Sequence, residues 1–182
     1  MAITSLLRAR RFIARFRAEK RGSAAVEFAF VALPFLALLF AVLELGMVFL
    51  VSTTLQNAAD AAGRKIRTGE LQASGGTAAT FKNSICADMS WLGSDCASNL
   101  TVDVRKFSTF AGSSADSPVT NGAIDPTKTK WEPGGAEEIV LVRAYYSWTL
   151  VTPLLNAGLQ NLSNGKRLIQ TTVTFRNEPW GT

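Results

Sequence analysis

The longest apolar stretch of the chain runs from Ser23 to Val51 and contains two charged residues, Glu27 and Glu44. Its leucine, phenylalanine, valine and alanine residues occur all around a helix instead of along one stripe, which is typical of a helix surrounded by lipid. About 20 helical residues cross the roughly 30 Å core of a bilayer, so the stretch is long enough to span one. The pattern predicts a transmembrane helix over residues 23–51.

Two other interpretations of this stretch remain open. The first is the buried helix of a soluble protein, and the second is the cleaved signal peptide of a secreted protein. The rest of the chain is too short and too polar to surround such a helix, which disfavours the first interpretation. The run is longer than the apolar region of a signal peptide, and no clear A-x-A cleavage sequence follows it, which disfavours the second.

Beyond Val51 the helical pattern continues, but with a single apolar face. Apolar residues recur at helical spacing, at Leu55, Ala59, Ala62 and Ile66. Polar and charged residues occupy the other face, and Gly69 is a candidate C-cap. The sequence therefore predicts one long helix that begins in the membrane and ends packed against a folded domain.

Three later segments have the alternation or the β-branched and aromatic composition of strands, namely residues 100–107, 138–148 and 167–175. A small antiparallel sheet packed on the C-terminal half of the long helix is the simplest architecture, so the fold class is α+β. Shorter elements are expected between the strands. The pattern predicts a short helix over residues 80–87 and irregular loops over 72–79 and 108–137. It predicts a short helix or an apolar turn over residues 153–162.

The positive charge of the chain is concentrated before the apolar stretch. The net charge is +5, and residues 1–22 hold seven of the 19 basic residues but a single acid, Glu19. The positive-inside rule then places the N-terminus in the cytoplasm. We expect a basic cytoplasmic leader (1–22), a single span of the inner, cytoplasmic membrane (23–51) and a periplasmic or extracellular domain (52–182). Because this domain is nearly neutral, no nucleic acid is expected as a partner.

The residues of the chain argue against catalysis. There is no histidine, which removes the commonest general base and the commonest zinc ligand. No G-x-S-x-G or S-x-x-K motif is present, and Asp103, Asp116 and Asp125 are scattered acids that we expect to be solvated. The sequence predicts no enzyme, no metal and no cofactor. Cys86 and Cys96 are expected to form a disulfide in an oxidising compartment.

The junction between leader and helix reads KRGSAAVEF and resembles the processing site of type IV pilin-like proteins. In that family a membrane-embedded prepilin peptidase cuts after the glycine. By this resemblance Gly22 and Ser23 flank the cut, Ser23 becomes the new N-terminus and Glu27 becomes residue five of the mature chain. A carboxylate inside an apolar helix is unfavourable by roughly 2.5–3.5 kcal/mol at mid-membrane, and the new α-amino group of a neighbouring subunit would offset this and set the register of a helical stack.

The residues that we expect to act in assembly are Glu27, Phe28 and Glu44. For Glu27 the alternative is a carboxylate that reaches the cytoplasmic interface without any pairing role. For Glu44 two interpretations remain, because its side chain either reaches the outer headgroups or is protonated, or else pairs with another subunit or an assembly platform.

Most of the chain from Gly22 onward resembles the TadE-like family of pseudopilins from tight-adherence (Flp) pilus systems, and the resemblance is weakest across residues 72–137. The resemblance rests on RGSAAVEFAFVALPFLALLF, LQNAADAAGRKIRTGEL and the late segment TTVTFRNEPW. It implies a pilin-like fold, membrane insertion and a role in assembling or priming the pilus. The implied partners are the inner membrane, a prepilin peptidase, other pilin-like subunits and the pilus assembly machinery. The domain is larger than that of a Flp major pilin, which favours a minor subunit.

One alternative function stays open, namely a single-pass membrane protein that is never processed and whose outer domain binds a partner. Within the late segment, Arg176 and Glu178 are expected to pair and Trp180 to anchor the edge of the domain, as a tucked strand end or as an assembly contact.

Overall fold

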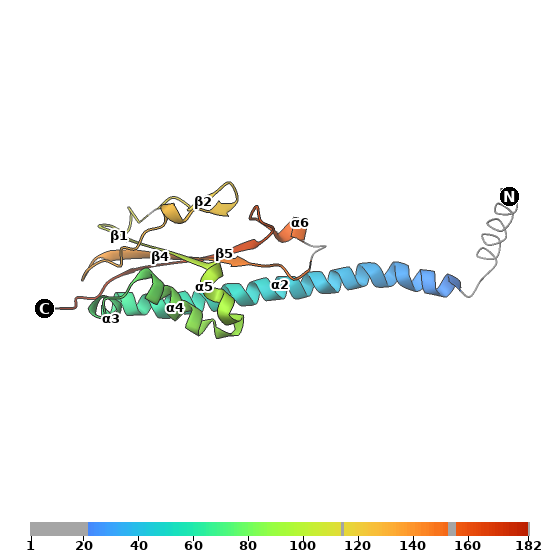
Figure 1. Cartoon of the computed structure of the whole chain (residues 1–182), viewed down its shortest axis with the longest axis horizontal. Helices are drawn as coiled ribbons and strands as arrows, with labels where there is room; N and C mark the ends of the chain where they lie inside the picture. The colour runs from blue at the N-terminus through green and yellow to red at the C-terminus, as the bar shows by residue number, and fades with distance from the viewer. Residues whose placement is uncertain (1–21, 114, 153–155, 182) are drawn as a thin grey trace, which may run out of the picture. The chain divides into compact units, whose positions relative to one another are not determined.

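The computed structural model describes residues 22–113, 115–152 and 156–181. Apart from Gly22, the predicted leader lies outside these residues. The described chain has the predicted α+β composition, with the long helix α2 (Ser23–Arg67) followed by a small antiparallel sheet and short helices (Figure 1). The chain divides into two compact units, residues 1–43 and residues 44–182.

The described part of the first unit is the apolar beginning of α2. Its large side chains are exposed, as Phe28 and Val31 illustrate. The helix includes an 18-residue window that is apolar enough to cross a membrane, and none of that window is buried within the described chain. A core helix of a soluble protein buries most of such a window, so this helix fits the anchor of a single-pass membrane protein.

The second unit uses the last part of α2 as one layer of its core. The buried residues of this part include the predicted apolar face, and they are Val51, Leu55, Ala58, Ala59, Ala62 and Ile66. The helix ends just before Gly69, whose φ of 77° lies in the left-handed region that a residue after a helix end often adopts. The predicted amphipathic helix and its terminating glycine are both present.

The sheet has the order β1–β4–β5, with both pairs antiparallel. Its strands are β1 (Leu100–Phe107), β4 (Ile139–Trp148) and β5 (Arg167–Arg176), which match the three predicted segments to within one residue. Alternate side chains such as Val104, Val142 and Ile169 pack with the buried face of α2 in one apolar cluster. Figure 1 shows the last part of α2, which belongs to the second unit, running along the sheet.

The central strand β4 is buried on both faces, because its first eight residues are all buried. The face away from α2 is covered by the connection between β1 and β4, which we expected to be an irregular loop. That expectation is wrong for part of the connection. It contains the hairpin of β2 (Val119–Thr120) and β3 (Ala123–Ile124) and the 3-10 turn η3 (Pro126–Lys128).

Further along the same connection, Trp131 forms a parallel bridge with Val104 of β1. The amide of Val104 donates to the carbonyl of Lys130 at 2.9 Å, and the amide of Glu132 donates to the carbonyl of Val104 at 2.8 Å. The Trp131 ring also lies 5.4 Å from the ring of Phe81. This bridge occupies backbone groups at the outer edge of β1, which would otherwise be open to pairing with another chain.

Four short helical elements connect α2 to β1, where we expected a loop over 72–79 and one short helix. They are α3 (Glu70–Ala73), α4 (Ala78–Asp88), the 3-10 helix η2 (Ser90–Asp95) and α5 (Cys96–Asn99). The expected disulfide joins Cys86 of α4 to Cys96 of α5, with 5.6 Å between the Cα atoms. Between β4 and β5 lies α6 (Asn156–Leu159). Residues 153–155, the first part of the predicted helix or turn at 153–162, lie outside the described residues.

Candidate membrane-anchor and assembly site

The predicted processing junction lies at the start of α2. Gly22 has a 3-10 helical conformation and immediately precedes Ser23, the first residue of the α-helix. Gly22 is exposed, and a Cβ atom added to it would meet no other atom within 4 Å. The residues before it, including the basic part of the leader, lie outside the described chain. The backbone at the predicted cut is therefore not covered by the described residues.

Glu27 and Phe28 follow in the second turn of α2, and both are exposed. Phe28 is 74% exposed, which is unusual for a large apolar side chain in water and ordinary for one that faces lipid or a neighbouring helix. The roles predicted for these two residues need a second subunit, so they stay predictions.

Glu44, the other acid of the apolar stretch, is 2% exposed and lies at the start of the second unit. Its carboxylate accepts hydrogen bonds from the backbone amides of Val151, at 3.0 and 3.1 Å, and Thr152, at 2.9 Å. The sequence alone left open lipid headgroups, protonation or another subunit for Glu44, whereas the observed partner is a segment of the same domain. No signal in the sequence connects residue 44 to a loop so far along the chain.

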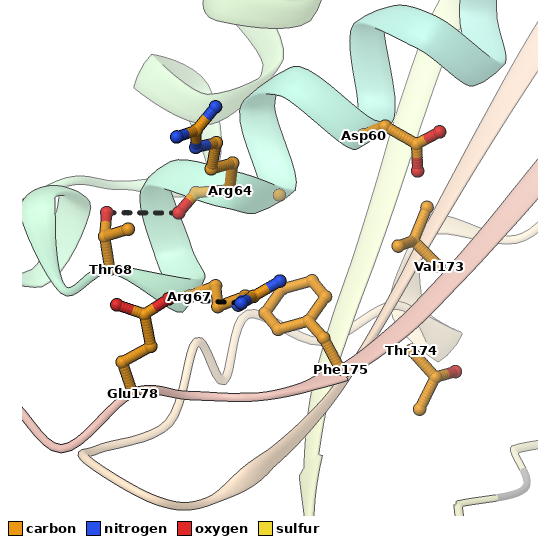
Figure 2. Close-up of a pocket in the computed structure, with 9 residues that line it drawn as sticks. Asp60, Arg64, Arg67, Thr68, Val173, Thr174, Phe175 and Glu178 are labelled. Atoms are coloured by element: carbon orange, nitrogen blue, oxygen red, sulfur yellow. Dashed lines mark hydrogen bonds and ion pairs between the residues drawn. The ribbon is translucent and has the colours of Figure 1, made fainter.

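A groove of about 620 Å³ opens between the last turns of α2 and strand β5 (Figure 2). Arg67 lies 3.2 Å from the carboxylate of Glu178, and both side chains are about half exposed. Asp60 and Arg64 line the same groove, and both are exposed. The groove therefore offers charges of both signs, with the ring of Phe175 at its floor, 3.2 Å from the position of a Cβ on Gly63.

The late segment 175–180 closes the end of α2, and the pairing predicted inside it is wrong. Glu178 pairs with Arg67 instead of Arg176, and its amide donates to the carbonyl of Arg67 at 2.9 Å. Arg176 donates to the carbonyl of Glu137 at 2.8 Å. The ring of Trp180 covers Gly69, where a Cβ atom would lie 2.5 Å from it. The segment thus ties strand β5 to the helix end.

Asp103 is wholly buried in β1, so the expectation that it is solvated is wrong. Its carboxylate accepts hydrogen bonds from Arg105 Nε at 3.0 Å, Arg143 Nε at 3.0 Å and the Lys130 amide at 2.7 Å. Arg143 also donates to the carbonyls of Ala115 and Asp116, at 2.9 and 3.0 Å. This cluster fastens the β1–β4 connection to the sheet.

Asp116 and Asp125, which were also expected to be solvated, lie nearer the surface than Asp103. Asp116 is exposed, and Asp125 is half-buried. The hydroxyl and then the amide of Thr127 donate to the Asp125 carboxylate and lower its pKa. This is a capping interaction at the start of η3 and gives no sign of catalysis.

Beside the Asp103 cluster, burial raises the pKa of Tyr145, with the charge of Arg143 acting in the opposite direction. The Arg143 guanidinium carbon lies 5.8 Å from the centre of the Tyr145 ring. Because the Asp103 carboxylate is wholly buried and its donors come from the sheet and the β1–β4 connection, the cluster has the character of a structural network. Across residues 22–113, 115–152 and 156–181, no three metal-ligating side chains of His, Cys, Asp or Glu come together.

These features define an α+β protein with one exposed apolar helix that fits a membrane anchor. Residues 22–64 match the family model described as TadE-like protein, which confirms the resemblance predicted from the sequence. The match covers the predicted processing junction, the apolar part of α2 and most of its amphipathic part, and it suggests involvement in a Tad pilus-related function. No curated protein and no solved structure gives a significant match to the chain.

Proposed function

We propose that this protein is a minor pseudopilin of a tight-adherence (Flp) pilus, cut by a prepilin peptidase between Gly22 and Ser23. The observation that carries the proposal is the junction, where an exposed glycine directly precedes a long apolar helix with an acid in its second turn. The match to the TadE-like family over residues 22–64 supports it, because the matched segment begins at that glycine.

After the cut, Ser23 carries a new α-amino group at the start of α2. In the proposed assembly this amine of one subunit meets the Glu27 carboxylate of the next. An ion pair in a medium of low dielectric constant is strongly attractive, so a helix displaced by one residue would lose it. The part of the domain that carries the Cys86–Cys96 disulfide then lies on the outer side of the membrane, where the disulfide is stable.

The first experiment tests the cut. The wild-type protein, produced together with its prepilin peptidase, should migrate as a shorter species whose N-terminal sequence begins at Ser23. Gly22→Trp should stay at full length. Gly46→Trp is the matched control, because Gly46 is also exposed with no atom within 4 Å of an added Cβ, and it should be cut normally. Cleavage of Gly22→Trp at the same bond would reject the site.

The second experiment tests the role of Glu27. Glu27→Ala should be cut as efficiently as the wild type but should reduce the number of pili per cell. Glu70→Ala, a change at an exposed acid of the outer domain, is the control and should leave pili unchanged. Normal pili with Glu27→Ala would remove the register role. Uncut protein in cells with working pili would favour the alternative of an unprocessed membrane protein with a partner-binding domain.

A further inference from the structure

Glu44 lies in the second unit close to several exposed apolar side chains. Glu44 is 2% exposed, and its carboxylate holds the backbone amides of Val151 and Thr152. The side chain of Val151, in contrast, is 69% exposed. The three hydrogen bonds therefore hold a loop against α2 while an apolar side chain of that loop faces outward.

The helix residues near this contact are also apolar and exposed. Leu45 is 52% exposed, Phe49 is 71% exposed and Leu50 is 47% exposed. The first charged residue of α2 after Glu44 is Asp60. We call Leu45, Phe49, Leu50 and Val151 the apolar collar of the domain. In water such a collar would be unfavourable, because apolar surface is stabilised by removal from water.

The hydrogen bonds of the backbone amides at residues 151 and 152 indicate whether water or lipid surrounds this loop. Two adjacent amides in an exposed loop are satisfied by water at no cost, so they need no carboxylate. In a lipid environment each unpaired amide costs several kcal/mol, and a buried carboxylate is equally unfavourable without donors. Glu44 and the 151–152 backbone satisfy one another, which is the arrangement that a loop at membrane depth requires.

We propose that the apolar collar lies in the outer leaflet of the bilayer, so that residues 150–152 enter the membrane together with α2. The occupant of this surface is lipid at the boundary between headgroups and acyl chains. Exposed large apolar residues continue along α2 from Val26 to Leu50, which is longer than the ~20 residues needed to cross the hydrocarbon core. The excess at its outer end is the collar. The inference rests on the membrane anchor of the proposed function.

Depth-dependent fluorescence quenching tests the proposal on the full-length protein in vesicles of phosphatidylethanolamine and phosphatidylglycerol. Both native cysteines are joined in the disulfide, so a Val151→Cys variant can be labelled with the fluorophore NBD in the absence of reductant. The label should be quenched by spin-labelled lipid with its nitroxide near the headgroup, and should resist aqueous iodide. Phe49→Cys should behave in the same way.

Two reference positions separate the possible failures. Leu36→Cys labels the apolar part of α2 and should be quenched by lipid with a deep nitroxide. Thr109→Cys labels an exposed residue of the β1–β4 connection and should be quenched by iodide. If the Leu36 label is quenched by the deep nitroxide and the Val151 label is quenched by iodide, the membrane position of the apolar collar is rejected and the membrane anchor is retained. An iodide-accessible Leu36 label overturns both. A Val151 label that is protected from iodide and from both lipids is covered by protein, which also overturns the proposal.

The Glu44 contact provides an internal test. Glu44→Leu keeps an apolar side chain but removes every acceptor, so the Val151 label should become accessible to iodide. A hydrogen bond to a charged group contributes about 1.5–3 kcal/mol. The ratio of chains with the 150–152 loop held against α2 to chains with the loop released should therefore fall about tenfold or more. Glu44→Gln keeps one acceptor oxygen and should show a smaller effect. Equal quenching in Glu44→Leu and wild type would show that the carboxylate does not hold the loop.

Discussion

Asp103 and Arg143 form a buried ion pair between the neighbouring strands β1 and β4, with Arg143 Nε 3.0 Å from the carboxylate. Asp103 is 0% exposed and Arg143 is 8% exposed. The same guanidinium binds the carbonyls of two residues in the β1–β4 connection. One arginine therefore joins both strands and the segment that covers them.

Arg143→Met should strongly destabilise the domain that contains the sheet. It leaves the Asp103 carboxylate buried with one guanidinium fewer and releases two carbonyls, and breaking a buried pair in this way costs about 3–5 kcal/mol. Urea unfolding of the full chain in detergent, followed by circular dichroism, measures the loss. Lys106→Met is the matched control, because Lys106 pairs with Glu138 at the surface and such pairs contribute about 0–1 kcal/mol.

The double variant Asp103→Leu/Arg143→Met should recover part of the loss, since it removes the isolated charge together with its partner. A single Arg143→Met variant as stable as Lys106→Met would show that the pair does not fasten the connection to the sheet.

Gly69→Ala should destabilise the end of α2 for two separable reasons. Residue 69 has a φ of 77°, which costs an L-residue about 1–2 kcal/mol, and a Cβ atom would lie 2.5 Å from the Trp180 ring. Gly75→Ala isolates the first reason, because Gly75 has a φ of 67° and no atom within 4 Å of an added Cβ. Thermal unfolding should show Gly69→Ala to be less stable than Gly75→Ala. Trp180→Ala should abolish the difference between the two glycine variants, and a persistent difference would assign it to another contact.

The disulfide between Cys86 and Cys96 should stabilise the domain that contains the sheet by about 2–3 kcal/mol through restriction of the unfolded chain. The variant Cys86→Ala/Cys96→Ala should unfold at lower urea concentration by that amount. A reductant should shift the wild type towards the variant and leave the variant itself unchanged. Identical midpoints for the oxidised wild type and the variant would contradict this.

The stability of the domain should fall at alkaline pH because of its two tyrosines. Burial raises the pKa of Tyr145 above 10.0, and burial followed by the charge of Asp95 raises that of Tyr146. A raised pKa in the folded state means that the stabilisation is fully present below the unfolded value and is lost as pH rises through the folded one. The unfolding free energy should therefore decline above about pH 10.

Tyr145→Phe/Tyr146→Phe tests this prediction, because the chain has two tyrosines and the variant has no phenol left. Its stability should depend less on pH across the alkaline range than that of the wild type, in urea titrations at a series of pH values. The same slope in both proteins would assign the alkaline loss to other groups.

The strands and the two-part helix could be predicted because their signals are local. Alternation identifies β1 and β5, and the spacing from Leu55 to Ile66 identifies the buried face of α2. The β2–β3 hairpin was missed although its turn residues, Asn121 and Gly122, are the common pair for a tight hairpin turn, with φ values of 51° and 72°. That signal was present, but the flanking strands have two residues each and show no alternation.

The partners of charged residues could not be predicted, because they depend on register and tertiary packing. Asp103 occupies a polar position of an alternating strand, which in an isolated sheet faces water. It is buried because Arg143 lies opposite it and the β1–β4 connection folds over both. Glu44 finds its donors in a loop that comes close only when β4 has paired with β1 and packed on α2. The Glu178–Arg67 pair likewise requires β5 to be in place.

The closure of the helix end by residues 175–180 has a consequence for biogenesis. α2 is synthesised long before the segment that carries Phe175, Glu178 and Trp180, so its last turns lack their cover until that segment has been translated. During that interval Gly63, Arg67 and Gly69 are open to chaperones and proteases. The end of α2 can therefore be covered only after residues 175–180 have been made, and a chain interrupted before residue 175 would leave it exposed.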